Sequence, residues 1–460
     1  MSHRVEKVGG SSMIAFDSVL KNIILRPKEK SLYNRIVVVT AYQGITDALL
    51  ESTNSRELGV YQRILCGDNS WEAALASITQ RLLLLNDNLF ADPILRIQAD
   101  DFIQDRVSQT RQWIHEHLSN MHLDTIVHED SSALIRERLA SIGEAHSAFN
   151  TVLKAKRYGV KARFLDLLGA PEKPRGPLDK QIKTSLEELN LDNELPVVAG
   201  CASNSTIDSF QTDRRYGDLT LSKIAVLTKA KQAIIYKPHH LSTGDPDLVG
   251  VDHSSPLGQS NYQVAQEIVS LTNDVVHPSA IKELSNQDIN LNVKCTFDPE
   301  HPGTVISNNY QSEDNHIDVI TGKQDVYALK VEINDCSQYL DKLFALLATS
   351  NINMLYSDMK GRILSSYFNC LPAESGLVLG KVKKLLPDVE VSIQKVALIS
   401  VIGTNIMANR SLHLGCSALE KQGIVPDAIH ICGNDSSIKF VVACSQYRAS
   451  TCALHHAFFQ

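Results

Sequence analysis

Apolar residues follow two different patterns along the chain. Residues 35–41 (RIVVVTA), 195–200 (LPVVAG) and 233–236 (AIIY) form continuous apolar runs, which are typical of strands buried on both faces of a parallel sheet. Residues 51–128 are mostly polar, and the apolar residues within 78–85 and 102–118 recur at the spacing of a helix. Another helical pattern covers 131–153. These patterns predict an α/β fold with a mostly parallel central sheet.

From residue 325 onward the pattern changes to short alternating strands and amphipathic helices. The order strand, helix, strand, strand, helix occurs over 326–386 and again over 395–459. Two such sets in tandem predict ferredoxin-like βαββαβ units. We therefore expect three domains, at 1–306, 320–390 and 391–460.

Composition narrows the class of protein. The chain has 460 residues, of which 43% are hydrophobic and 21% charged, and its net charge is −7. The basic residues form no polybasic run, which argues against nucleic acid or anionic lipid as the main partner. Nine cysteines without a CxxC pair argue against a disulfide framework or a zinc site. With no apolar signal core and no run long enough to span a bilayer, the expected location is the cytoplasm, with no membrane partner.

The N-terminal stretch 5–13 (VEKVGGSSM) carries the first candidate chemistry. Gly9 and Gly10 lack Cβ atoms, so the backbone amides there could close around an oxyanion, and a helix starting at the serines would add its positive dipole end. Lys7 would supply one full positive charge. The same residues are also an ordinary start for a strand–turn–helix unit, so this stretch alone leaves both interpretations open.

Five further polar residues have both a functional and an ordinary interpretation. Thr40 and Thr46 follow a buried apolar run, where open α/β sheets bind ligands, but a strand residue and a helix cap would look the same. Glu144 lies in the middle of a helical pattern among small residues, where a carboxylate usually faces solvent. His239 and His240 are adjacent without a third ligand, so we expect loop residues there rather than a metal site.

Residues 7–12 (KVGGSS) resemble the K-[FY]-G-G-[ST]-S signature that opens the aspartate kinases of the amino-acid kinase superfamily. Matching segments recur in the family's order over nearly the whole chain, at 40–47 (TAYQGITD), 143–148 (GEAHSA), 196–200 (PVVAG), 212–220 (TDRRYGDLT), 243–246 (TGDP), 271–278 (LTNDVVHP) and 292–306 (NVKCTFDPEHPGTVI). The resemblance implies a three-layer αβα amino-acid kinase sandwich followed by two ferredoxin-like ACT domains.

The resemblance also implies the roles of individual residues, with ATP and Mg²⁺ as cofactors and no metal bound by protein residues alone. The implied catalytic residues are Lys7 and Asp218. The implied contacts to L-aspartate are Thr40, Thr46, Glu144, Arg214 and Gly217, with Glu144 on the α-ammonium and Arg214 on the α-carboxylate. The implied nucleotide contacts are Lys7, Gly9, Gly10, Ser11, Tyr236, Thr243, Asp245, Pro246 and Asp274.

Several positions depart from the family pattern. Cys201 stands where a phenylalanine is usual, and Asp213, Arg215 and Tyr216 replace small residues beside Arg214. Asp247 takes the place of a phosphate-facing arginine. The change at Asp247 is expected to affect nucleotide affinity more than the type of reaction. Cys201 should make one wall of the amino-acid pocket smaller, and the replacements beside Arg214 should make their loop stiffer.

The resulting hypothesis is an ATP-dependent kinase that converts L-aspartate to 4-phospho-L-aspartate. The ACT pair implies a homodimer and a lysine or threonine effector, although residues 334–338 lack the usual glycine-bearing effector loop and the modules could serve only to dimerise. Residues 59–62 (GVYQ) resemble the subgroup associated with ectoine biosynthesis. Two alternatives stay open, a kinase for another small amino acid and a non-catalytic amino-acid sensor.

Overall fold

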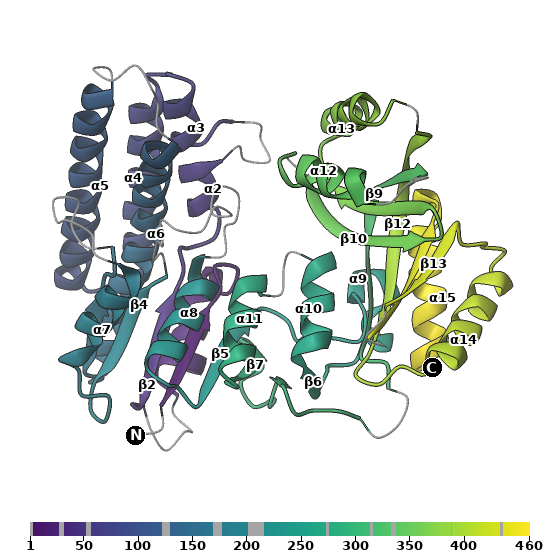
Figure 1. Cartoon of the computed structure of the whole chain (residues 1–460). Coiled ribbons are helices and arrows are strands. Elements are labelled where there is room, and N and C mark those ends of the chain that lie inside the picture. Colours follow the sequence, from purple (N-terminus) through teal and green to yellow (C-terminus); the bar gives the residue numbers. More distant parts are fainter. Residues whose placement is uncertain are drawn as a thin grey trace. The chain divides into compact units, whose positions relative to one another are not determined.

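The computed structural model describes residues 3–26, 32–51, 57–121, 129–168, 177–200, 216–272, 276–312, 316–332, 337–350, 352–387, 389–432 and 436–460. The chain forms two compact units, Met1–Leu241 with Ser279–Ser307, and Ser242–Pro278 with Asn308–Gln460. Each unit is described by itself below (Figure 1). These units divide the chain differently from the expected boundaries at 306 and 390, because residues 242–278 pack with the C-terminal part.

The first unit is built on a mostly parallel sheet. Its strands are β1 (Arg4–Val8), β2 (Arg35–Val39), β3 (Ala162–Leu165), β4 (Leu195–Ala199), β5 (Gln232–Lys237), β7 (Asn290–Cys295) and β8 (Thr304–Ser307). They follow the order β3-β4-β2-β1-β5-β7-β8, and β8 alone among them is antiparallel to its neighbour. All residues of β2 and β4 are buried, so the strands predicted from the apolar runs are confirmed.

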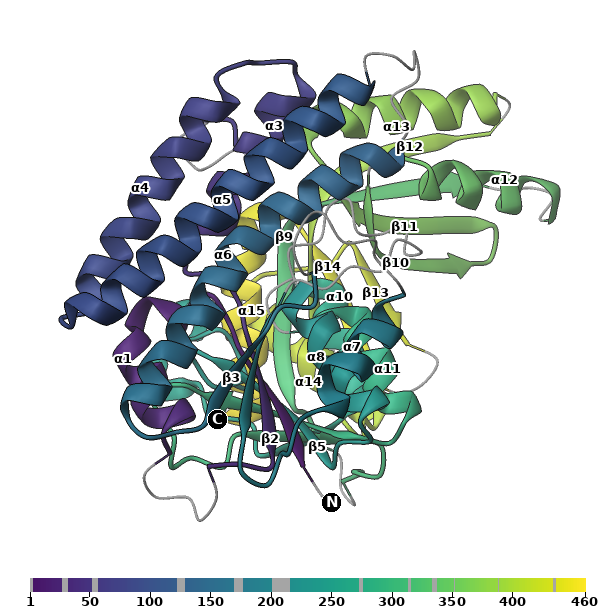
Figure 2. The same ribbon diagram turned by 90° about the vertical axis from the view of Figure 1, so that its left-hand side faces the viewer.

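Helices of the first unit cover this sheet and extend beyond it. They are α1 (Phe16–Val19), α2 (Ile45–Leu50), α3 (Val60–Leu65), α4 (Trp71–Leu89), α5 (Pro93–Met121), α6 (Glu129–Arg157), α7 (Leu178–Glu187), α8 (Tyr216–Leu227) and α11 (Pro278–Asn286). Figure 2 shows α4, α5 and α6 lying side by side, which confirms the predicted helical region between the first strands. No helix in the described ranges is both long and apolar enough to cross a membrane.

The helix expected after the N-terminal serines is shorter and less regular than predicted. It consists of a 3₁₀ turn at Met13–Ala15, the four-residue α1, and a π-helical turn at Leu20–Ile24. Ser12 does not cap it, because its hydroxyl lies 2.8 Å from the Thr296 hydroxyl instead. A helix this short adds little dipole at its N-terminus.

The second unit contains an antiparallel sheet with the order β10-β11-β9-β12-β14-β13. Its strands are β9 (Val319–Glu332), β10 (Asn353–Lys360), β11 (Ile363–Asn369), β12 (Val391–Ile402), β13 (Ala428–Ile431) and β14 (Ser437–Val442). Its helices are α12 (Ser337–Ala348), α13 (Pro372–Leu385), α14 (Ala408–Lys421) and α15 (Tyr447–Phe459). Residues 242–278 add α9 (Pro246–Val249), β6 (Gln259–Asn261) and α10 (Tyr262–Leu271).

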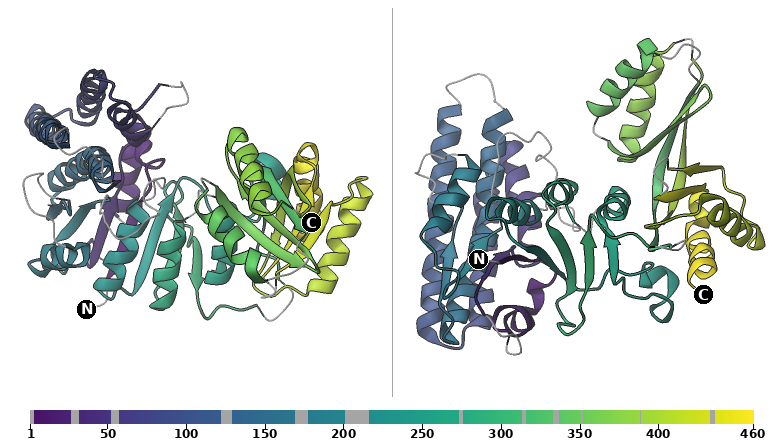
Figure 3. Two further views of the ribbon diagram at one scale, coloured as in Figure 1. Left: turned by 45° about the horizontal axis from the view of Figure 1, so that its top comes forward. Right: turned by 60° about the horizontal axis from the view of Figure 1, so that its bottom comes forward.

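The long strands β9 and β12 are shared by two ferredoxin-like modules. Residues 326–331 of β9 pair with 391–396 of β12 and, with β10, β11, α12 and α13, complete one βαββαβ unit around its own apolar core. Residues 319–323 pair with 398–402 in the other module, whose core includes residues of β14, α14 and α15. Figure 3 shows the two helix pairs at opposite ends of these strands.

The two predicted modules are therefore confirmed, but they do not follow one another in tandem. The second module takes its fourth strand from residues 319–323, which precede the first module in sequence. The described residues after β14 form α15, and the strand next to 398–402 is provided by 319–323. The first module is thus inserted into the second.

Candidate functional site

A buried ion pair lies at the centre of the first unit. Lys7 stands next to the last residue of β1, and Asp218 is in the first turn of α8. The Lys7 Nζ atom is 2.9 Å from Asp218 Oδ1, and the two side chains are 7% and 0% exposed. Because each buried charge stabilises the other in a medium of low dielectric constant, Asp218 holds the Lys7 ammonium in one position.

Gly9 and Gly10 bring the backbone close to the Lys7 amine. A Cβ atom on Gly9 would lie 3.8 Å from Lys7 Nζ, and one on Gly10 would lie 2.9 Å from the Ala41 carbonyl oxygen. The Gly9 N–H donates to the Tyr236 carbonyl at 3.3 Å, so it is not available to a ligand. In the described part of the chain, the N–H groups of Gly10 and Ser11 donate to no acceptor, which leaves two donors in the loop that follows β1.

Gly217 packs against the Lys7 side chain, and Thr40 packs against Gly217. The Thr40 hydroxyl donates to the Val8 carbonyl at 3.0 Å, which fixes its rotamer. A Cβ atom on Gly217 would lie 2.6 Å from Thr40 Cγ2 and 3.1 Å from Lys7 Cε. Glycine is therefore required at 217 for Thr40 and Lys7 to approach α8 as closely as they do.

This contact yields a prediction about folding. Gly217→Ala should lower the free energy of unfolding by about 1–3 kcal/mol, since the Thr40 methyl cannot rotate away without losing its hydrogen bond. The matched control is Gly380→Ala on α13, where a Cβ would meet no atom within 4 Å and which should stabilise by up to about 1 kcal/mol. Urea unfolding measures both, and an unchanged or higher stability of Gly217→Ala would contradict the packing described.

Glu144 is a buried carboxylate on α6. Composition alone had suggested that it would face solvent. It is 5% exposed, and its Oε2 atom has no hydrogen-bond partner among the described residues. Burial raises the pKa of Glu144 to about 8, although the nearby positive charge of Lys7 opposes this rise. A buried carboxylate with an unsatisfied oxygen is suited to a ligand that carries a hydrogen-bonding cation, such as an ammonium group.

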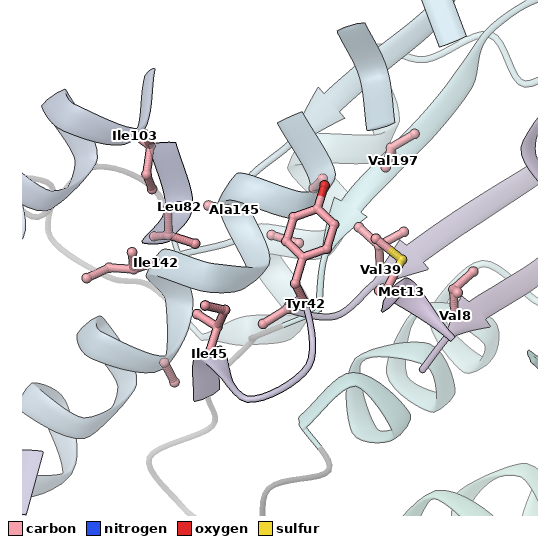
Figure 4. Packing of buried hydrophobic residues seen from close by; sticks show 14 of the residues in the cluster. Val8, Met13, Val39, Tyr42, Ile45, Leu82, Ile103, Ile142, Ala145 and Val197 are labelled. Carbon is pink, nitrogen blue, oxygen red and sulfur yellow. The ribbon is translucent and has the colours of Figure 1, made fainter. Parts of the chain in front are cut away.

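Small residues beside Glu144 bring α6 close to the loop that follows β2. A Cβ on Gly143 would lie 2.8 Å from the Ala41 Cβ atom, and the Ser147 hydroxyl donates to the Thr40 carbonyl at 2.8 Å. Ile142 and Ala145 on the same helix belong to the main apolar cluster (Figure 4). The small residues of 141–148 were the sequence signal for this contact, but Gly143 and Ser147 were not identified as site residues.

His146 takes no part in this site. Its ring contacts the Asn86 and Asn150 side chains, and burial lowers the pKa of His146 to about 3, so the ring is neutral at physiological pH. Thr46 lies in the first turn of α2 and is half-buried, while the N-cap of that helix is Gly44 with φ of 75°. Thr46 is thus not a cap.

Tyr236 contributes its backbone rather than its side chain to the surroundings of Lys7. Its hydroxyl group accepts a hydrogen bond from Arg26, in a buried ionic cluster with Glu6 and Arg35. Burial raises the pKa of Tyr236 well above its ordinary value. Lys7 and Glu6 are neighbours on one strand and point to opposite faces of the sheet, so the Tyr236 ring lies on the face away from Lys7.

The remaining predicted residues either belong to the second unit or lie outside the described residues. Thr243, Asp245 and Pro246 belong to the second unit, where Asp245 caps α9 by accepting a hydrogen bond from the Asp247 N–H at 2.9 Å. Arg214 and Asp274 lie outside the described residues. The structure thus brings together Lys7, Gly9, Gly10, Thr40, Glu144, Gly217 and Asp218.

Comparisons with known proteins agree on one family. The model of the amino acid kinase family matches residues 3–295. The chain is 34% identical over 467 residues to the aspartate kinase Ask_Ect of Stutzerimonas stutzeri (strain A1501), an alignment covering 100% of this chain and 98% of the relative. The fold is similar to that of E. coli aspartokinase III in complex with aspartate and ADP (TM-score 0.72, 17% identity) and in complex with lysine and aspartate (TM-score 0.70, 16% identity), with 100% of each chain covered.

Proposed function

This chain belongs to the amino acid kinase family and is an aspartate kinase, and we propose that Lys7, Asp218 and Glu144 carry its reaction. The enzyme transfers the γ-phosphoryl group of ATP to the side-chain carboxylate of L-aspartate and forms 4-phospho-L-aspartate. The observation that best supports the proposed roles is a buried carboxylate with an unsatisfied oxygen, Glu144, under the electrostatic influence of the Lys7 ammonium. We assign the reaction to the domain predicted for residues 1–306.

The acceptor carboxylate needs little activation, because it is already ionised near pH 7. The barrier comes from repulsion between the two anions and from their alignment. Lys7 would neutralise charge on the phosphoryl group as it is transferred, and the N–H groups of Gly10 and Ser11 would donate to its oxygens. Asp218 would act by holding the Lys7 ammonium in place, as its 2.9 Å ion pair suggests.

Glu144 would bind the α-ammonium group of aspartate and so set the direction of the substrate. The cation would supply the partner that the Glu144 Oε2 atom lacks, and the side-chain carboxylate would then point toward Lys7. ATP-bound Mg²⁺ fits this arrangement, because Mg²⁺ takes most of its ligands from phosphates and water and Asp218 would supply a protein oxygen. When bound, the ion offsets negative charge on the phosphates.

Acyl-phosphate trapping tests the function directly. The purified chain is incubated with ATP, Mg²⁺, hydroxylamine and one candidate acid at a time. Hydroxamate should form with L-aspartate and not with glutamate, which would separate an aspartate kinase from a kinase for another amino acid. An amino-acid sensor would bind aspartate but form no hydroxamate with any acid.

Arg214 remains a sequence-based proposal for the α-carboxylate of aspartate, since a guanidinium group matches a carboxylate with two parallel hydrogen bonds. Arg214→Ala should raise KM for aspartate about tenfold with a smaller change in kcat. Arg111→Ala is the matched control, because Arg111 is exposed on α5. Steady-state kinetics that are the same for both variants would count against the role of Arg214.

We also propose how the enzyme assembles, which effector it binds and where in the cell it acts. The paired ferredoxin-like modules would form a homodimer and bind an amino-acid effector such as lysine or threonine. We place the protein in the cytoplasm, which is consistent with the free state of the seven cysteines in the described residues.

A further inference from the structure

The segment 243–246 (TGDP), for which we propose nucleotide contacts, is packed against the C-terminal helix α15. The Thr243 Oγ1 atom is 3.0 Å from the His455 Nε2 atom. Thr243 is also held through its backbone, because the Ile320 N–H donates to its carbonyl at 2.8 Å and its own N–H donates to the Ser255 carbonyl at 2.9 Å. Both Thr243 and His455 are buried.

Three further contacts join the same segment and its continuation to α15. A Cβ atom on Gly244 would lie 2.7 Å from His455 Cδ2, so the imidazole ring rests directly on the glycine. Arg448 donates to the Asp247 carbonyl at 3.0 Å, and the Cys452 thiol donates to the Leu248 carbonyl at 3.1 Å. These α15 side chains, one turn apart, therefore follow the segment from Thr243 to Leu248.

We propose that His455 is a positioning residue that holds the 243–246 segment in the shape that binds ATP. The inference rests on the proposed function, in which this segment contacts the nucleotide. It assigns to the last helix of the chain, in the second ferredoxin-like module, a direct part in setting nucleotide affinity. His455 itself need not touch the nucleotide.

The chemical state of His455 agrees with this role. Burial lowers the pKa of His455, and the neighbouring His253 and His456 lower it further, so the ring is neutral at physiological pH. The Thr243 hydroxyl already accepts a hydrogen bond from the Ser255 N–H at 3.2 Å. It can therefore donate its own proton to the Nε2 atom of neutral His455, which fixes the hydroxyl orientation.

The test compares two substitutions of His455 by steady-state kinetics. His455→Ala removes the hydrogen bond and the ring, and KM for ATP should rise roughly five- to tenfold, while KM for aspartate stays within about twofold. His455→Gln can place an acceptor near the position of Nε2 and should restore most of the ATP affinity. The matched control is His413→Ala on α14, an exposed histidine of the same module, which should leave both constants unchanged.

A double-mutant cycle then shows whether His455 acts through Thr243. If it does, Thr243→Val combined with His455→Ala should raise KM for ATP by little more than either change alone. An unchanged KM for ATP in His455→Ala would overturn the inference, and so would equal rises in both KM values, which indicate a general structural effect. A wild-type chain that forms no hydroxamate would instead refute the proposed function, and this inference would fail with it.

Discussion

Replacement of Lys7 by alanine is expected to abolish phosphoryl transfer, with kcat falling about 100-fold or more. Lys7 would be the ammonium group that meets the developing charge on the phosphoryl oxygens, and a donor of this kind contributes about 3 kcal/mol or more to the transition state. The substitution would also leave the carboxylate of Asp218, which is 0% exposed, without the ammonium that now lies 2.9 Å away. The hydroxamate assay at saturating ATP and aspartate measures the loss.

Two further variants test the assignment of Lys7. Lys7→Arg keeps the positive charge, but the Lys7 side chain is 7% exposed and its Nζ atom lies 2.9 Å from Asp218 Oδ1, so a larger guanidinium group would be displaced and activity should not return. The control is Lys21→Ala, which changes an exposed lysine in the π-helical turn Leu20–Ile24 and should leave kcat unchanged. Near-normal kcat in Lys7→Ala would refute the assignment of Lys7.

Substitution of Glu144 by glutamine should raise KM for aspartate about 100-fold, with a smaller effect on KM for ATP. The amide keeps the shape of the side chain but cannot neutralise an ammonium group in a buried site. Glu57→Gln, which changes an exposed carboxylate of the same unit, is the matched control. If aspartate binds Glu144→Gln and wild type equally well, the ammonium is held elsewhere.

The raised pKa of Glu144 gives this prediction a dependence on pH. With a pKa of about 8 the free enzyme holds Glu144 mostly protonated at pH 7, and binding of an ammonium group favours the ionised form. Aspartate should therefore bind more tightly as pH rises from 6 toward 8, with release of about one proton per site at pH 7. Calorimetry in buffers of different ionisation enthalpy detects this proton, which Glu144→Gln should not release.

The same shift affects the stability of the free enzyme, with the opposite sign. The folded-state pKa of Glu144 lies above its ordinary value of 4.5, so the folded chain binds more protons than the unfolded chain between these values. The contribution of Glu144 to stability is thus complete below about pH 4.5 and is lost as pH rises through about 8. Glu144→Gln should lack this component of the pH dependence.

Much of the fold could be predicted because its signals are local. Residues 36–39 of β2 are apolar and all buried, as expected for a strand covered on both faces, so this strand could be recognised from the sequence. The buried cluster of Glu6, Arg26 and Arg35 gave no such signal. Each of these charges looks like a surface residue, and only the folding of the chain brings the two guanidinium groups to the carboxylate.

The candidate site could also be predicted only in part, because some of its contacts join segments that are distant in sequence. Composition placed Glu144 in solvent, and only the family resemblance identified it as a site residue. Its burial depends on Gly143 fitting against Ala41, a contact between segments about 100 residues apart that helical periodicity does not contain. The inserted order of the two modules was missed for a related reason, because the pairing of residues 319–323 with 398–402 joins strands that the pattern treats separately.

The strands shared by the two modules determine where this chain can be shortened. A fragment beginning at residue 391 would lose the partner of 398–402 and expose a bare strand edge, which favours aggregation. Removal of the inner module, with residues 323 and 398 joined by a short turn, would leave every strand of the outer module paired. The boundary between the two modules therefore lies in the middle of both β9 and β12. Truncation at one position in the sequence cannot separate the modules.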